Sequence, residues 1–85
     1  MNAYELKPND NHKSFYGKAL IIHRNGEIVL QSYDMEVCKI IPGGAFVRMW
    51  DGYSVTTMRH VNAFLDCFGI PGGGKTWWMQ QPIQN

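Results

Sequence analysis

The hydrophobic period of this chain changes from two to nearly four at Ser54, and that change constrains the fold more than any other feature of the sequence. Before Ser54, short runs of strand-forming residues alternate with turn residues, as in an antiparallel sheet. After it, apolar residues recur along one helical stripe, namely Met58, Val61, Leu65 and Phe68, widened by Phe64. Because a sheet and a helix each bury one apolar face, each can cover the other. The sequence therefore predicts an α+β fold: a four-stranded antiparallel β-meander followed by one amphipathic α-helix packed on the sheet.

Turn residues divide the first half of the chain into four predicted strands, over residues 15–23, 27–33, 35–41 and 45–50. Asn25-Gly26 separates the first two, and this dipeptide readily adopts the positive φ angles of a two-residue hairpin turn. Asp34 turns the chain before the third strand, and Pro42 with two following glycines ends that strand. Alternation places Ile28 and Leu30 on one face of the second strand, which we expect to point into the core.

The predicted helix begins after Ser54 and ends near residue 68. The Ser54 hydroxyl can accept hydrogen bonds from the free amides of the first turn, and Gly69 followed by Pro71 is a typical helix stop. Residues 1–13 are polar and have no sustained period, so we expect them to form a flexible N-terminal leader or an arm that docks late. Residues 14–85 are predicted to form a single domain, which suits a chain of 85 residues.

Three glycines at positions 72–74 and two adjacent tryptophans, Trp77 and Trp78, follow the predicted helix. We expect the glycines to form a hinge and the residues after them to form an aromatic C-terminal tail. Adjacent side chains of an extended segment point to opposite sides, so both rings cannot enter one core. At least one ring is therefore expected at the surface or in an interface, with simple capping of the sheet edge as an equal alternative for the tail.

Composition and charge exclude several classes of protein. Eight Lys and Arg against seven Asp and Glu give a formal charge of +1, too little for the general phosphate attraction of most nucleic-acid binders. No apolar run approaches the roughly 20 residues of a membrane span, and the N-terminus has no apolar signal stretch, so we expect a soluble, cytoplasmic protein without membrane contact. Cys38 and Cys67 are too few for a disulfide framework, and His12, His23 and His60 lack metal-ligand spacing. No metal and no cofactor are expected.

Residues 69–76 match the nucleotide-binding pattern G-x-x-x-x-G-K-[ST] letter for letter. Phosphate binding by such a loop requires a strand before it, a helix after it and a downstream acidic residue for magnesium. Here a predicted helix precedes the loop, and no Asp or Glu follows Thr76. We therefore expect no nucleotide binding at this segment.

A hydrolase would need a nucleophile, a base and an orienting carboxylate within hydrogen-bond reach. The residues considered for these roles are Ser54 or Cys67, His60, and Asp51 or Asp66. His60 and Cys67 share a helix face but lie roughly 10 Å apart along the axis, at about 1.5 Å per residue. Ser54 already has a simpler role as helix cap. We assign no catalytic residue and expect that the protein is not an enzyme.

Two adjacent segments, WDGYS at 50–54 and TTMRH at 56–60, are followed by Asn62 and Phe64. In this block the sequence resembles a family of short uncharacterised proteins carried by bacterial phages, plasmids and integrated mobile elements. Segments 14–19, 30–33 and 72–78 are similar to that family as well, so the resemblance covers about residues 14–78. It implies a mobile-element setting. The block itself fits either a corner between strand and helix or an exposed polar and aromatic surface.

The aromatic and polar residues after residue 50 form the candidate interaction surface: Tyr53, Arg59, His60, Asn62, Lys75, Trp77 and Trp78. Rings and guanidinium groups of this kind are favoured at protein interfaces. We therefore predict a small non-enzymatic protein-protein interaction module, whose partner is another protein or a second copy bound through a sheet edge or the tryptophan tail. The alternative is a small nucleic-acid-binding regulator that uses Arg48, Arg59 and Lys75 together with stacked aromatics.

Overall fold

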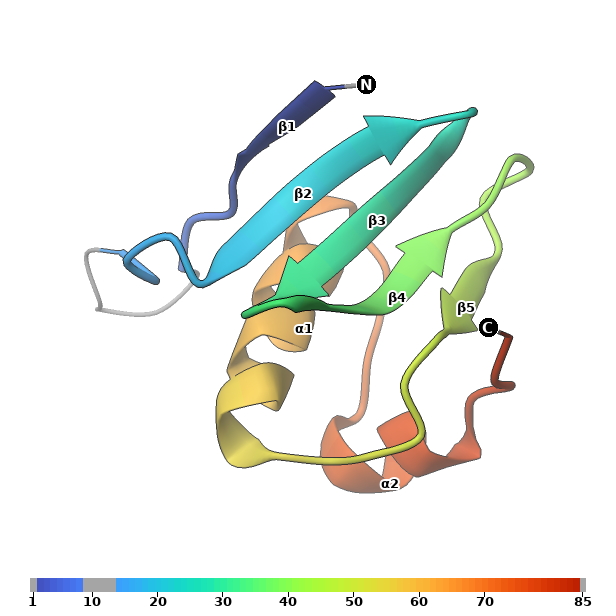
Figure 1. Cartoon of the computed structure of the whole chain (residues 1–85). Helices are drawn as coiled ribbons and strands as arrows, with labels where there is room; N and C mark the ends of the chain where they lie inside the picture. The colour runs from blue at the N-terminus through green and yellow to red at the C-terminus, as the bar shows by residue number, and fades with distance from the viewer. Residues whose placement is uncertain (1, 9–13, 85) are drawn as a thin grey trace.

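The computed structural model describes residues 2–8 and 14–84, which form one five-stranded sheet and two helices (Figure 1). The elements are β1 (Asn2–Glu5), β2 (Ala19–Arg24), β3 (Glu27–Ser32), β4 (Met35–Ile40), β5 (Phe46–Arg48), α1 (Val55–Cys67) and α2 (Gly74–Gln80). The strands lie in sequence order, and every neighbouring pair is antiparallel. The α+β class, the meander of β2 to β5 and the helix after it are confirmed. The prediction of four strands and one helix is wrong in number, because β1 and α2 were not predicted.

The first strand corrects the prediction of a flexible leader for part of residues 1–13. β1 pairs with β2 in the register Ala3 opposite Ile22, and all four of its residues are exposed. The Tyr4 hydroxyl lies 3.0 Å from Nε2 of His23 on β2, and Leu6 just beyond the strand is buried in the core. Backbone pairing with the edge of β2 therefore gives this segment its strand conformation. The sequence of the segment does not by itself specify a strand. Residues 9–13 of the predicted leader lie outside the described residues.

The hairpin between β2 and β3 forms at Asn25-Gly26 as predicted, with φ angles of 52° and 78°. Leu30 is buried in the core, and Ile28 is partly buried against it, which confirms the assigned face. The register between β3 and β4 shifts after Leu30. This irregularity lets the adjacent residues Val37 and Cys38 both enter the core, which simple alternation along a strand forbids.

Helix α1 lies across one face of the sheet (Figure 1) and begins and ends where the sequence predicts. The Ser54 hydroxyl accepts a hydrogen bond of 3.0 Å from the Thr57 amide. At the other end, Gly69 has a φ of 69°, and the Ile70 amide donates to the Leu65 carbonyl over 2.9 Å. A left-handed glycine with this pairing is the Schellman stop. The buried face of α1 contains the predicted stripe except for Phe68, which is only partly buried.

The predicted flexible aromatic tail is instead helix α2, which packs beneath β5 and against α1 (Figure 1). Packing and backbone conformation constrain the glycines at positions 72–74, the last of which begins α2. A β-carbon on Gly72 would lie 2.8 Å from Cδ1 of Leu65, and Gly74 has a φ of 70°. After α2 the chain forms a parallel bridge between Ile83 and Arg48 of β5. No helix within the described residues is long and apolar enough to cross a membrane.

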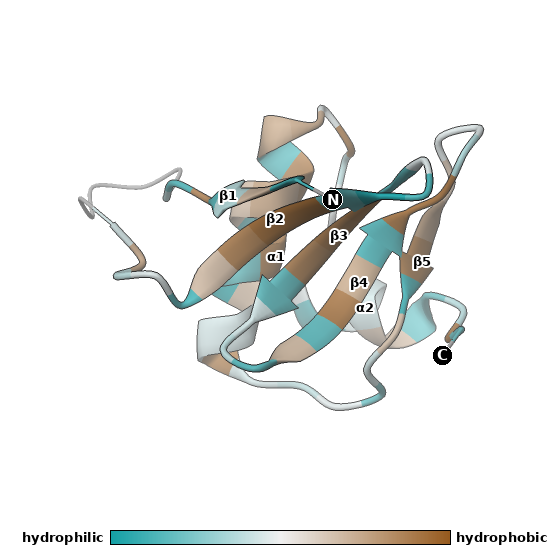
Figure 2. Ribbon diagram, turned by 45° about the horizontal axis from the view of Figure 1, so that its top comes forward, coloured by the Kyte–Doolittle hydropathy of each residue, from teal (hydrophilic) through white to brown (hydrophobic). Residues whose placement is uncertain are grey.

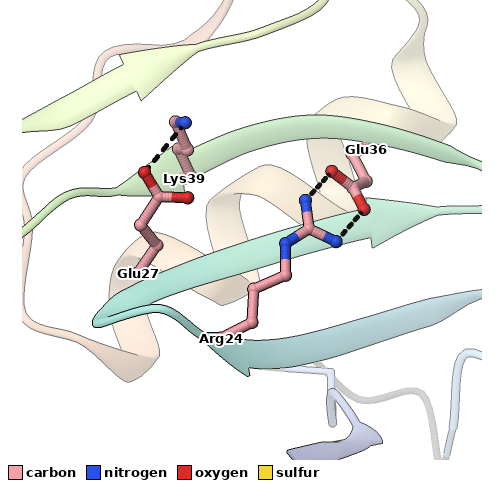
Figure 3. A network of polar contacts seen from close by, with 4 residues as sticks. All are labelled: Arg24, Glu27, Glu36 and Lys39. Atoms are coloured by element: carbon pink, nitrogen blue, oxygen red, sulfur yellow. Dashed lines mark hydrogen bonds and ion pairs between the residues drawn. The ribbon is translucent and has the colours of Figure 1, made fainter. Parts of the chain in front are cut away.

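Both helices lie on one side of the sheet (Figure 2). The opposite face has two ion pairs that join β2, β3 and β4 (Figure 3). The guanidinium of Arg24 on β2 pairs with both carboxylate oxygens of Glu36 on β4, and Lys39 Nζ lies 3.0 Å from a Glu27 oxygen. The hydrogen bonds from Arg24 hold the pKa of Glu36 below its ordinary value. Alternation places Val29 on the same face, and it has no exposed surface. The side chains of these ion pairs therefore lie beside buried apolar residues on the face of the sheet that is opposite the helices.

Candidate functional site

A mainly apolar hollow of about 470 Å³ opens between the β3–β4 turn and the segment that leads into α1. It is lined by Ser32, Tyr33, Asp34, Met35, Val37, Trp50, Tyr53, Ser54 and Thr57, and we call it the Trp50 hollow. Gly52 leaves room for the tryptophan, because a β-carbon there would overlap the Trp50 indole. The volume falls within the roughly 300 to 1,000 Å³ of ligand-sized sites.

A second, smaller hollow of about 220 Å³ shares Tyr33 as a wall. It is lined by Ser14, Phe15, Tyr16, Lys18, Tyr33, Thr56, Arg59 and His60, and we call it the Phe15 hollow. Cations lie against its aromatic walls: the guanidinium carbon of Arg59 is 5.3 Å from the centroid of the Phe15 ring, and Lys18 Nζ is 5.7 Å from that of Tyr33. The two hollows thus differ in character, one apolar and the other aromatic and basic.

Exposed apolar side chains gather around the two hollows. Tyr16 is 79% exposed, Val55 70%, Tyr33 48% and Met35 47%. These are four of the seven large apolar side chains that are strongly exposed in the described part of the chain. A small domain gains stability by burying such groups, so their concentration at one end is typical of a binding surface.

A buried polar cluster contributes Ser32 and Thr57 to the Trp50 hollow and His60 to the Phe15 hollow. Ser32 Oγ lies 2.7 Å from His60 Nδ1 and 3.4 Å from Thr57 Oγ1. The His60 ring packs edge-on against Phe15, with ring centroids 4.6 Å apart, and is only 1% exposed. Desolvation, with smaller contributions from Arg59 and Lys18, lowers the pKa of His60. His60 is therefore neutral at pH 7 and acts as a structural hydrogen-bonding group.

Acidification is expected to destabilise the protein through His60. Because its pKa is lower in the folded state than in the unfolded state, the unfolded chain binds more protons, and stability falls as the pH drops below about 6.5. The loss is complete only below the folded-state pKa. We expect the free energy of unfolding, measured with urea at intervals from pH 7.5 to 5.5, to decrease in the wild type.

The matched variant for this prediction is His60→Asn, whose side-chain amide can keep the hydrogen bond to Ser32. It loses the ring contact with Phe15, so its stability is lower throughout, but its pH dependence over the same range is expected to be flatter. The other histidines are common to both proteins, and the hydrogen bonds from Arg24 hold the pKa of Glu36 below its ordinary value and so below this range. Equal slopes for the two proteins would contradict the assignment to His60.

The structure brings four of the predicted interaction residues to this end of the molecule. Tyr53 lines the Trp50 hollow, and Lys75 Nζ lies 4.9 Å from the centroid of its ring. Arg59 and His60 line the Phe15 hollow. His60 is buried, however, so its ring lies beneath this surface and is not accessible to a partner.

The other three predicted residues lie elsewhere. Asn62 is on a different side of α1, where it borders the 70–74 loop. Trp78 is completely buried: its Nε1 donates to the Gly52 carbonyl over 2.7 Å, and the Arg48 guanidinium carbon lies 4.9 Å from its ring. Trp77 is partly buried against Phe46, with ring centroids 5.2 Å apart. The expectation of one exposed surface that includes His60 and Trp78 is therefore wrong.

The sequence did not predict the residues that build the two hollows, above all Ser32, Tyr33 and Met35. One signal was present, because Ser32 continues the alternation of Ile28 and Leu30 and so belongs to the inward face. A polar residue at such a position needs a buried partner. The partner, His60, lies 28 residues away on α1, and nothing in the sequence pairs the two.

The geometry also clarifies two motifs of the sequence. A nucleotide-binding loop is preceded by a strand, but the motif at residues 69–76 is preceded by helix α1. A helix, α2, does follow residues 69–73. Ser54 caps α1, and His60 bonds to Ser32 in place of Ser54 or Cys67, so the residues considered for a hydrolase do not assemble. Over residues 2–8 and 14–84, no three His, Cys, Asp or Glu side chains gather as a candidate metal site.

Comparison with known proteins gives one finding. Residues 4–80 match the model of a family of unknown function, DUF8033. No curated protein and no solved structure gave a match. The matched segment runs from β1 through α2 and includes every residue that lines the two hollows. Since this is nearly the whole chain, the protein belongs to the DUF8033 family.

Proposed function

We propose that this protein is a non-enzymatic protein-protein interaction module that binds its partner at the Trp50 hollow and the rim around it. The observation that carries the proposal is the concentration of exposed Tyr16, Tyr33, Met35 and Val55 around an apolar hollow. Interfaces are rich in tyrosine, tryptophan and methionine, and an apolar pocket that accepts a partner side chain is typical of their energetic centres.

The alternative function, nucleic-acid binding, has less support from the geometry. Arg48, one of the three cations assigned to it, is only 2% exposed, and its Nε donates to the Trp50 carbonyl over 2.9 Å. It also packs on the Trp78 ring. A guanidinium in this position holds β5 and α2 together and is not available to a phosphate.

We also propose that the protein acts in the cytoplasm and in the setting of a bacterial mobile element. The support for this setting is the resemblance of residues 14–78 to proteins of phages and plasmids. Phage structural, integrase or plasmid-maintenance genes next to genes of the DUF8033 family would support it. Consistent placement among chromosomal housekeeping genes would overturn it.

Affinity capture with matched variants tests the proposed function. Met35→Glu places a charge on the rim of the hollow, whereas Ile83→Glu places one on a residue of similar exposure, 46% against 47%, near the β5 edge. We expect a defined bacterial protein, identified by mass spectrometry and then purified, to bind the wild type and the Ile83 variant. Its affinity for the Met35 variant should fall at least about tenfold, as at an interface hot spot.

Salt dependence separates the proposed function from its alternative. A mixed protein interface loses little affinity between 50 and 200 mM salt, whereas a nucleic-acid complex with several phosphate contacts loses orders of magnitude. Retention of DNA or RNA that falls steeply with salt, with no captured protein sensitive to Met35→Glu, would favour the nucleic-acid regulator. Sedimentation of the wild type shows whether the captured protein is a second copy of the chain.

A further inference from the structure

We infer that the partner presents a peptide segment in which a large apolar side chain is flanked by acidic residues. The apolar side chain enters the Trp50 hollow, and the carboxylates lie against Lys18 and Lys75 on either side of it. This inference rests on the proposed function and specifies the chemistry of the partner.

The floor of the Trp50 hollow requires nothing polar from its occupant. The hydroxyls of Ser32 and Thr57 line it, but both belong to the buried cluster with His60. Among the described residues, no buried side-chain nitrogen or oxygen lacks a hydrogen-bond partner. A polar group placed against these paired hydroxyls would lose its hydration and would meet no unpaired buried side-chain atom in return. The occupant is therefore an apolar side chain, aromatic or long and aliphatic.

The apolar surface extends beyond the hollow, which favours a macromolecular partner over a small ligand. Val55, at the start of α1, and Tyr16, in the turn before β2, are the two most exposed of these apolar residues and do not line the Trp50 hollow. A small molecule seated in the hollow would leave them in water. A peptide segment that crosses the rim covers them together with the hollow.

Two lysines add positive charge to the rim, beside Arg59 at the Phe15 hollow. Lys75 Nζ lies over the ring of Tyr53 and Lys18 Nζ over that of Tyr33, and both tyrosines are walls of the Trp50 hollow. Neither ammonium group pairs with a carboxylate of the described residues. Asp34 is the one acidic residue among those that line the two hollows. Carboxylates on the partner complement this arrangement, and basic side chains would be repelled.

The backbone of Tyr16 gives independent support for a binding role of this surface. Tyr16-Gly17 has φ angles of 54° and 76°, nearly the same as the 52° and 78° of Asn25-Gly26. Asparagine adopts this left-handed conformation more readily than tyrosine, and the other tyrosine that adopts it, Tyr33 with a φ of 56°, is a wall of both hollows. The chain thus has the favourable residue in one turn and, in an equivalent turn, a strained tyrosine that is 79% exposed. Its ring stabilises little in the free protein, so we assign it to contact with the partner.

Selection from a random 12-residue peptide library on the wild-type protein tests the inference. We expect the selected peptides to share one large apolar residue with Asp or Glu on both sides. Synthetic versions measured by calorimetry should lose at least about tenfold in affinity when the apolar residue becomes Ser. They should lose about three- to tenfold when the acids become amides.

Three charge-neutralising variants locate the contacts. Lys18→Gln and Lys75→Gln should each weaken the selected peptides about threefold or more, whereas Lys7→Gln, at an exposed lysine beyond β1, should change the affinity less than about twofold. Selected peptides that are basic, that bind equally after Met35→Glu, or that bind the lysine variants unchanged would overturn the inference. Failure to select any peptide counts against it as well.

Reciprocal exchange of the two turn residues tests the part assigned to Tyr16. Tyr16→Asn should leave the melting temperature unchanged or raise it, while it weakens the selected peptides about threefold or more. Asn25→Tyr should lower the melting temperature and leave the affinity unchanged. A lower melting temperature with full affinity for Tyr16→Asn would show that the ring serves the fold.

The two proposals can fail separately. A captured protein that depends on Met35 but has no acidic segment in its binding region would overturn the partner chemistry and leave the interaction module intact. The absence of both a captured protein and a selected peptide that depend on the Trp50 hollow would overturn both.

Discussion

Replacing Trp78 by alanine is expected to destabilise the protein by about 3 to 5 kcal/mol, enough to unfold much of a domain of this size. The ring has no exposed surface, and its removal leaves a cavity at the junction of α2, β5 and the 50–53 segment. The Gly52 carbonyl also loses its donor. Urea unfolding followed by circular dichroism measures the effect.

Trp77→Ala is the matched control for this prediction. Trp77 is only partly buried, so we expect its loss to cost at least about 1 kcal/mol less than that of Trp78. Trp78→Phe separates ring packing from the hydrogen bond to Gly52 and is expected to fall between wild type and Trp78→Ala. Equal losses at positions 77 and 78 would contradict the packing of α2. A folded Trp78→Ala protein that loses only its association would restore the interface role predicted for this ring from sequence.

Leu65→Ala is expected to cost about 2 to 4 kcal/mol, because this side chain is 2% exposed in the core between α1 and the sheet. The neighbouring Asp66 is exposed, and Asp66→Ala should change stability by less than about 0.5 kcal/mol. The same urea measurement compares the two variants. Similar losses at both positions would mean that the buried face of α1 is assigned wrongly.

The close approach of Gly72 to Leu65 gives a sharper test of the same packing. A β-carbon at Gly72 would press on the Leu65 side chain, so Gly72→Ala should destabilise the wild type. In the Leu65→Ala background the obstructing methyl groups are gone, and the same change should cost less. A double-mutant cycle measures this difference, and strict additivity would exclude the contact.

Prediction from sequence succeeded where local chemistry decides the conformation. The Asn25-Gly26 turn, the Ser54 cap and the Gly69 stop each depend on backbone preferences of one or two residues, and all three form as predicted. The class of the fold followed from the change of period between strands and helix. The candidate site was predicted only in part: Tyr53, Arg59 and Lys75 do lie at one end of the molecule.

The tertiary structure decided everything that depends on contacts between distant segments. β1 exists because the edge of β2 supplies partners for its backbone, and α2 is ordered by burial of Trp78. Nothing local pairs Ser32 with His60, or aligns Tyr33 with Trp50 to form a hollow. The sequence by itself therefore determined the turns, caps and hydrophobic faces, which are encoded within a few residues. The number of elements and the shape of the candidate site came from side chains that meet only after folding, since packing selects among conformations that local preferences leave open.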